Sequence, residues 1–115
     1  MIYNQMVVDQ LSDAEVDRLF HALADATRRD IVRRTLTEQV SVTTLAAAYD
    51  MSFAAVQKHV ALLEEVGLVS KEPNGRERLV RAEPDRLGQA QTLLGQLEEL
   101  WRARFSQLDA VLTEE

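Results

Sequence analysis

The stretch from Ser41 to Val69 constrains the fold of this chain more than any other. Ser41 or Thr43 is placed to cap a short helix, and Ser52 is placed to cap a longer one, because a side-chain hydroxyl can accept from a free amide of the first turn. Only Tyr49–Asp50–Met51 separate the two helical patterns. We therefore predict two helices joined by a tight turn, the helix-turn-helix motif.

The helix that begins after Ser52 has one apolar face. At 100° per residue its larger aliphatic side chains gather on one side, and these are Val56, Val60, Leu63 and Val66. Gly67 follows where a left-handed residue ends a helix. The outward face carries small residues with Gln57 and Lys58, which suit the edges of bases in a DNA major groove. An ordinary amphipathic core helix would look similar, so this helix alone is weak evidence.

A β-hairpin is predicted directly after this helix. Residues 68–72 and 76–81 have strand patterns, and Pro73-Asn74-Gly75 between them favours a tight turn. Arg76 and Arg78 lie at this hairpin, where a wing meets phosphates or the minor groove. A solvated surface hairpin would carry the same arginines, but a helix-turn-helix followed by a basic hairpin defines a winged helix.

Three segments resemble the ArsR/SmtB-type winged-helix repressors in order and spacing. They are FHALADATRRDIV (20–32), VTTLAAAYDMSFAAVQKHVALLEEVGLV (42–69) and NGRERLVR (74–81). The resemblance implies a dimeric DNA-binding transcriptional regulator, usually a repressor. Relatives often have glycine in the turn where this chain has Asp50. Aspartate tolerates a left-handed backbone better than most residues, so we expect the turn to survive.

The length of 115 residues indicates a single winged-helix domain, residues 1–115. Within it we expect an apolar N-terminal arm (1–11), the helix-turn-helix (41–67), the wing (68–82) and a C-terminal dimerisation helix (84–113). No apolar run is long enough to span a membrane, and the first ten residues lack the pattern of a signal peptide. We therefore expect a cytoplasmic protein without membrane contact.

Two further helices are predicted before the motif. Ser12 and Glu15 form a capping box, and Asp25 is placed to cap the next helix. Four arginines decorate that second helix: Arg28, Arg29, Arg33 and Arg34. Because it should lie behind the motif, we favour structural or solvated roles over phosphate contacts. Residues 37–41 are expected to form a loop.

The C-terminal segment from Pro84 has a long apolar stripe. Its members at helical spacing include Leu87, Leu94, Leu97, Trp101, Phe105 and Leu108. A helix of this length, about 43 Å at 1.5 Å per residue, exceeds the width of a small domain. We therefore predict that a second copy covers the stripe in a homodimer, with the first helix contributing. The alternative is that the segment bends at Gly88 or Gly95 and folds back onto its own core.

The net charge of −6 is unusual for a DNA-binding protein, but the charge is unevenly distributed. Residues 52–81 hold five Lys/Arg against four acidic residues, and both flanking segments are acidic. Screening over about 10 Å allows this region to act locally. We expect modest non-specific binding that weakens with salt.

The metal chemistry of many relatives is absent from this sequence. Relatives bind metals through cysteine pairs on the first helix of the motif or through histidines and carboxylates on the last helix. This chain has no cysteine, its last helix has no histidine, and its two histidines, His21 and His59, lie far apart. A metal needs three or four convergent ligands, so we predict no metal and no cofactor. No nucleophile or phosphate-loop motif is present either, so an enzyme is not expected.

These observations predict a mostly α fold with a small β-hairpin wing, dimerising through terminal helices. The predicted function is a sequence-specific transcriptional regulator that binds double-stranded DNA as a homodimer on an inverted repeat, acting as a repressor. The predicted DNA-binding residues are Ser52, Phe53, Ala54, Gln57, Lys58, His59, Arg76 and Arg78. Ser52 would bind phosphate, Gln57 and Lys58 base edges, and Phe53 or Ala54 a thymine methyl; His59 is either packed or facing phosphate.

The alternative is a winged-helix module for protein interaction, or for a small-molecule effector, without specific DNA binding. The acidic net charge favours it slightly. The sequence leaves open whether a small molecule or a protein relieves repression.

Overall fold

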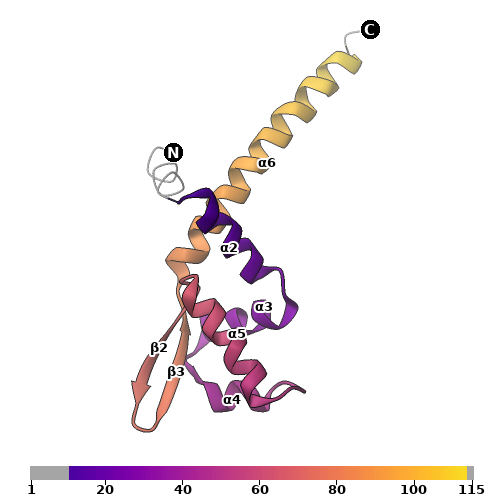
Figure 1. The fold of residues 1–115 in the computed structure, drawn as a ribbon. Coiled ribbons are helices and arrows are strands. Elements are labelled where there is room, and N and C mark those ends of the chain that lie inside the picture. Colours follow the sequence, from indigo (N-terminus) through magenta and orange to yellow (C-terminus); the bar gives the residue numbers. More distant parts are fainter. Residues whose placement is uncertain (1–10, 114–115) are drawn as a thin grey trace.

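The computed structural model describes residues 11–113 of the chain (Figure 1). The predicted N-terminal arm lies outside the described residues except for Leu11. The elements are α2 (Asp13–Leu23), α3 (Ala26–Thr37), β1 (Val40–Ser41), α4 (Val42–Ala47), α5 (Phe53–Glu65), β2 (Val69–Asn74), β3 (Glu77–Ala82) and α6 (Pro84–Thr113). The predicted class, a mostly helical fold with a β-hairpin wing, is confirmed.

The helix starts are set by the predicted caps. Ser12 accepts from the amide of Glu15 while the Glu15 side chain accepts from the amide of Ser12, which completes the capping box of α2. Asp25 caps α3, and Ser52 caps α5. For α4 the cap is Ser41, whose hydroxyl accepts from the amide of Thr44 at 3.1 Å. Each cap satisfies an amide that the helix itself leaves unpaired.

The sheet has three antiparallel strands in the order β1-β3-β2. The prediction of a loop over residues 37–41 was wrong at both ends, since Thr37 is the last residue of α3, and Val40 and Ser41 pair with Val80 and Leu79 of β3. Two residues are too few to show the alternation by which strands are predicted. Their pairing is visible only when β3 lies beside them.

The hairpin turn lies later in the chain than the predicted Pro73-Asn74-Gly75, because Pro73 and Asn74 belong to β2. Asn74 pairs with Glu77, so the two-residue loop is Gly75-Arg76. Gly75 has a φ of 64° at the first loop position, which glycine occupies in type II′ hairpins. The glycine therefore supplies the turn as predicted, but in a different position of it.

The backbone is left-handed at Gly67 but not at Asp50. Gly67 has a φ of 83° just after α5, as predicted. The turn with Asp50 survives as predicted, but no non-glycine residue among 11–113 has a positive φ, so Asp50 is not left-handed in it. The turn before Ser52 closes with ordinary backbone angles, which explains why it does not need glycine.

The core lies between the helices and the sheet. It is made of aliphatic side chains from every layer, including Leu19, Ile31, Leu45, Val56, Val60, Leu63, Leu68 and Val80. Val56, Val60 and Leu63 are fully buried, so the predicted apolar face of α5 packs inward. Its opposite face is left for the surface.

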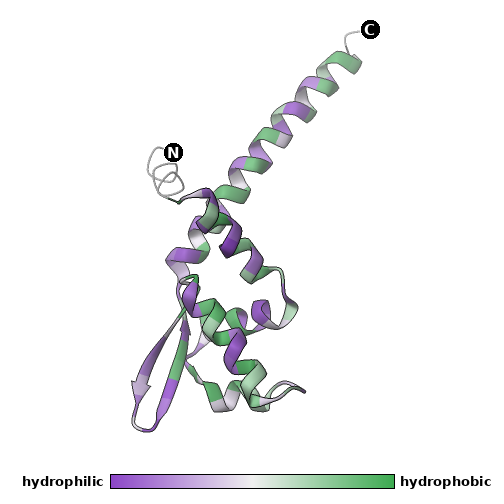
Figure 2. Ribbon diagram, in the orientation of Figure 1, coloured by the Kyte–Doolittle hydropathy of each residue, from purple (hydrophilic) through white to green (hydrophobic). Residues whose placement is uncertain are grey.

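Helix α6 is continuous over 30 residues and extends away from the rest of the chain (Figures 1 and 2). Leu87 and Ala90 pack against the core, whereas the apolar side chains further along are exposed. These are Leu94, Leu97, Leu100, Trp101, Phe105, Leu108, Val111 and Leu112. The fold-back alternative was therefore wrong. None of the described helices is long and apolar enough to cross a membrane.

Candidate nucleic-acid interface

The N-terminal end of α5, helix α4 and the tip of the β2–β3 hairpin lie at the end of the molecule opposite the C-terminus of α6 (Figure 1). An open groove of about 500 Å³ runs between them. Its lining comes from β1, α4, α5 and the β2–β3 hairpin, and the residues are Ser41, Val42, Thr43, Phe53, Gln57, Lys71, Arg76, Glu77 and Arg78. The groove thus brings the helix-turn-helix and the wing together on one surface.

The outward face of α5 is built from small and polar side chains. Ser52, Ala54, Gln57 and Lys58 are exposed, and so is Phe53 despite its ring, at 47%. The Ser52 oxygen accepts from the amide of Ala55 at 3.1 Å, so its own hydrogen remains available to an acceptor outside the helix. Such a face permits close approach of a nucleic acid backbone.

The wing supplies positive charge that no carboxylate among residues 11–113 neutralises through an ion pair. Arg76 and Arg78 are exposed, and no carboxylate of residues 11–113 lies within 4 Å of either guanidinium; the same holds for Lys58 on α5. Glu77 lies between the two arginines in sequence and lines the same groove. The hairpin tip is hydrophilic in Figure 2.

Five groove residues were not among the predicted site residues, and they are Ser41, Val42, Thr43, Lys71 and Glu77. Thr43 lies in the first turn of α4 and is exposed. Lys71 belongs to β2, and its ammonium forms an ion pair with Glu64 of α5 at 3.4 Å. The place of Thr43 beside a predicted cap was a usable signal. Nothing in the strand pattern indicated which face of the hairpin Lys71 would take.

His59 is half-buried rather than on the outward face of α5. Its Nδ1 lies 3.2 Å from the Nη1 atom of Arg28 on α3. Arg28 also donates to two carbonyls at the end of α2, from Nε to Ala22 at 2.8 Å and from Nη2 to His21 at 3.2 Å. His59 was included among the predicted DNA-binding residues and left as either packed or facing phosphate; its contact with Arg28 was not predicted.

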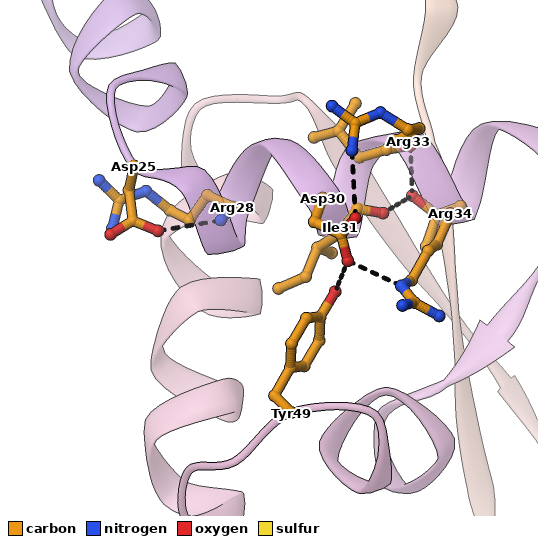
Figure 3. Close-up of polar contacts among 9 residues, drawn as sticks. Asp25, Arg28, Asp30, Ile31, Arg33, Arg34 and Tyr49 are labelled. Atoms are coloured by element: carbon orange, nitrogen blue, oxygen red, sulfur yellow. Dashed lines mark hydrogen bonds and ion pairs between the residues drawn. The ribbon is translucent and has the colours of Figure 1, made fainter.

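The turn of the motif is held by Tyr49, Asp30 and Arg34 (Figure 3). The Tyr49 hydroxyl donates to Asp30 Oδ2 at 2.6 Å, and Arg34 Nε donates to the same oxygen at 2.7 Å. The hydrogen bonds from Tyr49 and Arg34 hold the pKa of Asp30 below its ordinary value. Burial, together with the bond to Asp30, raises the pKa of Tyr49 to about 12. These contacts tie the turn to α3.

The arginines of α3 have intramolecular partners. Arg29 donates to the carbonyl of Leu23 at 2.8 Å, as Arg28 does to the end of α2, and Arg33 pairs with Asp30. Positive groups are stabilising at a helix C-terminus because the last carbonyls lack partners. Within residues 11–113, no group of three or more His, Asp or Glu side chains is arranged to hold a metal ion.

Comparison with known proteins agrees with this geometry. Residues 23–72 match the family model described as a helix-turn-helix domain. The HTH-type transcriptional regulator Rv2034 of Mycobacterium tuberculosis is 35% identical over 85 residues, which are 74% of this chain and 77% of the relative.

Solved structures give the same result. An ArsR-like transcriptional regulator from Rhodococcus sp. RHA1 superposes with a TM-score of 0.75 at 28% identity, covering 89% of this chain and 96% of that one. The winged helix-turn-helix domain Mb0332 of Mycobacterium bovis, a homodimer, shares the fold at 23% identity, with a TM-score of 0.62 and coverage of 77% and 87%. The chain is a helix-turn-helix transcriptional regulator rather than an enzyme, and it belongs to the ArsR family.

Proposed function

We propose that this protein is a repressor that binds an inverted repeat in double-stranded DNA as a homodimer. The observation that carries the proposal is the groove in which Phe53 and Gln57 of α5 face Arg76 and Arg78 of the wing. The second helix of such a motif enters the major groove of DNA, and a wing beside it reaches the phosphate backbone of the DNA. We name α5 the recognition helix from here on.

The exposed residues of this surface divide by chemistry. Gln57 suits adenine and Lys58 suits guanine, while Phe53 or Ala54 suits a thymine methyl. Ser52, Arg76 and Arg78 suit phosphates, which fix position without reading sequence. His59 is proposed to act indirectly, because its Nδ1 is occupied by Arg28.

The exposed stripe on α6 supports the homodimer. Trp101 and Phe105 have rings 6.2 Å apart and are 64% and 59% exposed. A contiguous apolar surface of this kind is characteristic of a protein interface, and the Mycobacterium bovis relative in fold is a homodimer. Two-fold symmetry would place two recognition helices about one DNA turn apart. Repression would follow from occupying a promoter in the cytoplasm; relief by a small-molecule or protein effector is compatible with this arrangement.

The test is binding of the purified protein to the DNA upstream of its own gene, against a scrambled duplex, at about 50 and about 200 mM salt. We expect preference for the upstream duplex and an affinity loss of about a hundredfold or more between the two salts, since at least four phosphates per dimer would be neutralised. A reporter driven by the bound promoter should be repressed.

Substituting Lys58→Ala with Arg78→Ala should lower affinity for the specific duplex at least about tenfold. Arg18→Ala removes the same kind of charge from the exposed face of α2 and should have little effect. Absence of binding to either duplex at low salt would contradict the proposal and favour an interaction module. Higher reporter expression on binding would contradict repression.

A further inference from the structure

We infer that Arg28 is a positioning residue for the recognition helix, acting through the neutral side chain of His59. The role of α5 rests on the proposed function, but the contact itself does not. Arg28 lies on α3 and His59 on α5, 31 residues apart in sequence.

Arg28 joins three helices at one point. Its backbone amide donates to the Asp25 cap at 3.0 Å, so the residue is fixed at the start of α3. Its guanidinium donates to Ala22 and His21 at the end of α2 and reaches His59 with the remaining nitrogen. A guanidinium is planar with donors at fixed angles. The two carbonyls therefore set the direction in which the third donor meets α5.

The contact requires one protonation state of His59. A guanidinium has five N–H donors and no acceptor, so Nδ1 of His59 must accept. The imidazole then carries its single proton on Nε2. Protonation of Nδ1 would remove the acceptor and place a second cation 3.2 Å from Arg28 Nη1. The hydrogen bond between Arg28 and the recognition helix therefore exists only when His59 is neutral.

The charged groups around His59 give opposite contributions. Arg28 disfavours a charged imidazole, and Asp25, the cap of α3, favours one. Helix α4 has no titratable side chain, and Lys71 of β2 is engaged by Glu64 instead. Bonding to the Arg28 amide holds the pKa of Asp25 below its ordinary value, so Asp25 is ionised at both pH values of the test below.

The test compares wild type, His59→Asn, Arg28→Lys and His21→Asn at about pH 7.5 and about pH 5.5, on either side of the ordinary imidazole value. Asparagine places an acceptor near the position of Nδ1 at both pH values, so it preserves the contact. His21 is the only other histidine of the chain, which makes His21→Asn the matched control.

The first readout uses no DNA. Backbone amide spectra should show that Phe53 and Ala54, six and five residues from His59, shift on acidification in wild type and His21→Asn. In His59→Asn the amide resonances of these two residues should not shift on acidification. At both pH values the amide spectrum of Arg28→Lys should resemble that of acidified wild type. One ammonium cannot donate to the two α2 carbonyls and to His59 Nδ1 in the geometry of a guanidinium. Amides of the α5 terminus that shift alike in wild type and His59→Asn would overturn the inference.

The second readout is the ratio of affinities for the specific and scrambled duplexes at constant salt. This ratio cancels the attraction that an extra charge gives to any DNA. It should fall about fivefold or more on acidification in wild type, the lower end of typical coupling between sites, and remain steady in His59→Asn. A steady ratio in wild type would overturn the positioning role. Failure to bind either duplex would refute the proposed function, while the amide spectra would still test the Arg28 contact.

Discussion

The hydroxyl of Tyr49 joins the turn of the helix-turn-helix to Asp30, eleven residues before the motif begins. Its oxygen lies 2.6 Å from the carboxylate, and the Arg34 guanidinium lies 5.5 Å from the centre of its ring. A tyrosine donor matched to an ionised acceptor makes a stronger bond than two neutral groups do. The turn therefore has a fixed partner on α3, and the second helix starts from a fixed point.

Tyr49 should titrate far above an ordinary tyrosine. In a Tyr3→Phe background, where Tyr49 is the remaining tyrosine, tyrosinate absorbance should report a pKa of about 12. Because the folded pKa is raised, the stabilisation is complete below pH about 10 and is lost as pH rises towards 12. Asp30→Asn should lower the pKa of Tyr49 by removing the neighbouring negative charge, although burial still holds this pKa above that of an ordinary tyrosine. Titration near pH 10 with unchanged circular dichroism would contradict the assigned contact.

At the scale of elements, each helix of the motif begins at a serine cap, and the first turn of α5 lies at the proposed DNA surface. Ser52 has two proposed tasks, to accept from the Ala55 amide and to donate to a phosphate. The first stabilises the helix, and the second would hold the protein on DNA. Substitutions can separate the two roles of Ser52, because helix capping tolerates a negatively charged side chain whereas a phosphate contact does not.

Ser52→Asp should retain the stability of the protein, since aspartate is as good a cap as serine, yet it should weaken DNA binding because its carboxylate repels phosphate. Ser52→Ala should lower the free energy of unfolding by about 1 kcal/mol. Urea unfolding and binding to the same duplex measure the two effects. Equal DNA affinity for Ser52→Asp and wild type would show that no phosphate approaches this position.

At the scale of the whole molecule, the protein consists of a folded winged domain and the helix α6, which projects from it. The described residues span 69 Å in their longest direction against 31 and 25 Å in the others. Leu87 and Ala90 belong to the core, whereas the stripe from Leu94 onwards has no cover within residues 11–113. A second copy is the proposed cover.

Phe105→Glu should weaken self-association by about 30-fold or more, equivalent to about 2 kcal/mol, because it places a charge in the apolar stripe. Ala103→Glu adds the same charge on the other side of α6 and is the matched control. Sedimentation equilibrium measures both. A wild-type monomer at concentrations well above those used for DNA binding, or equal effects of the two substitutions, would contradict dimerisation through this face.

Much of the architecture was predictable because it depends on local chemistry. Ser12, Asp25 and Ser52 cap amides within three residues of themselves, and Gly67 relieves a backbone constraint at its own position. The apolar spacing of α5 follows from helix geometry alone. Such signals lie within one or two turns of the chain, so they do not depend on the rest of the fold.

The candidate site was only partly predictable. The exposed positions of α5 and the arginines of the wing follow from periodicity and turn composition. Lys71 in the groove, strand β1 and the Arg28–His59 contact join residues far apart in sequence. Their pairing depends on how α3, α5 and the sheet pack.

By itself, the sequence determined which segments are helices, where most of them begin, that a hairpin follows the motif, and that the family's metal ligands are missing, because residue type and short spacing decide these matters. Only the tertiary structure decided that Arg28 meets His59, that Tyr49 anchors the turn without a left-handed Asp50, and that α6 continues past its own core instead of folding back. These outcomes depend on distances between elements, which packing sets and no local pattern contains.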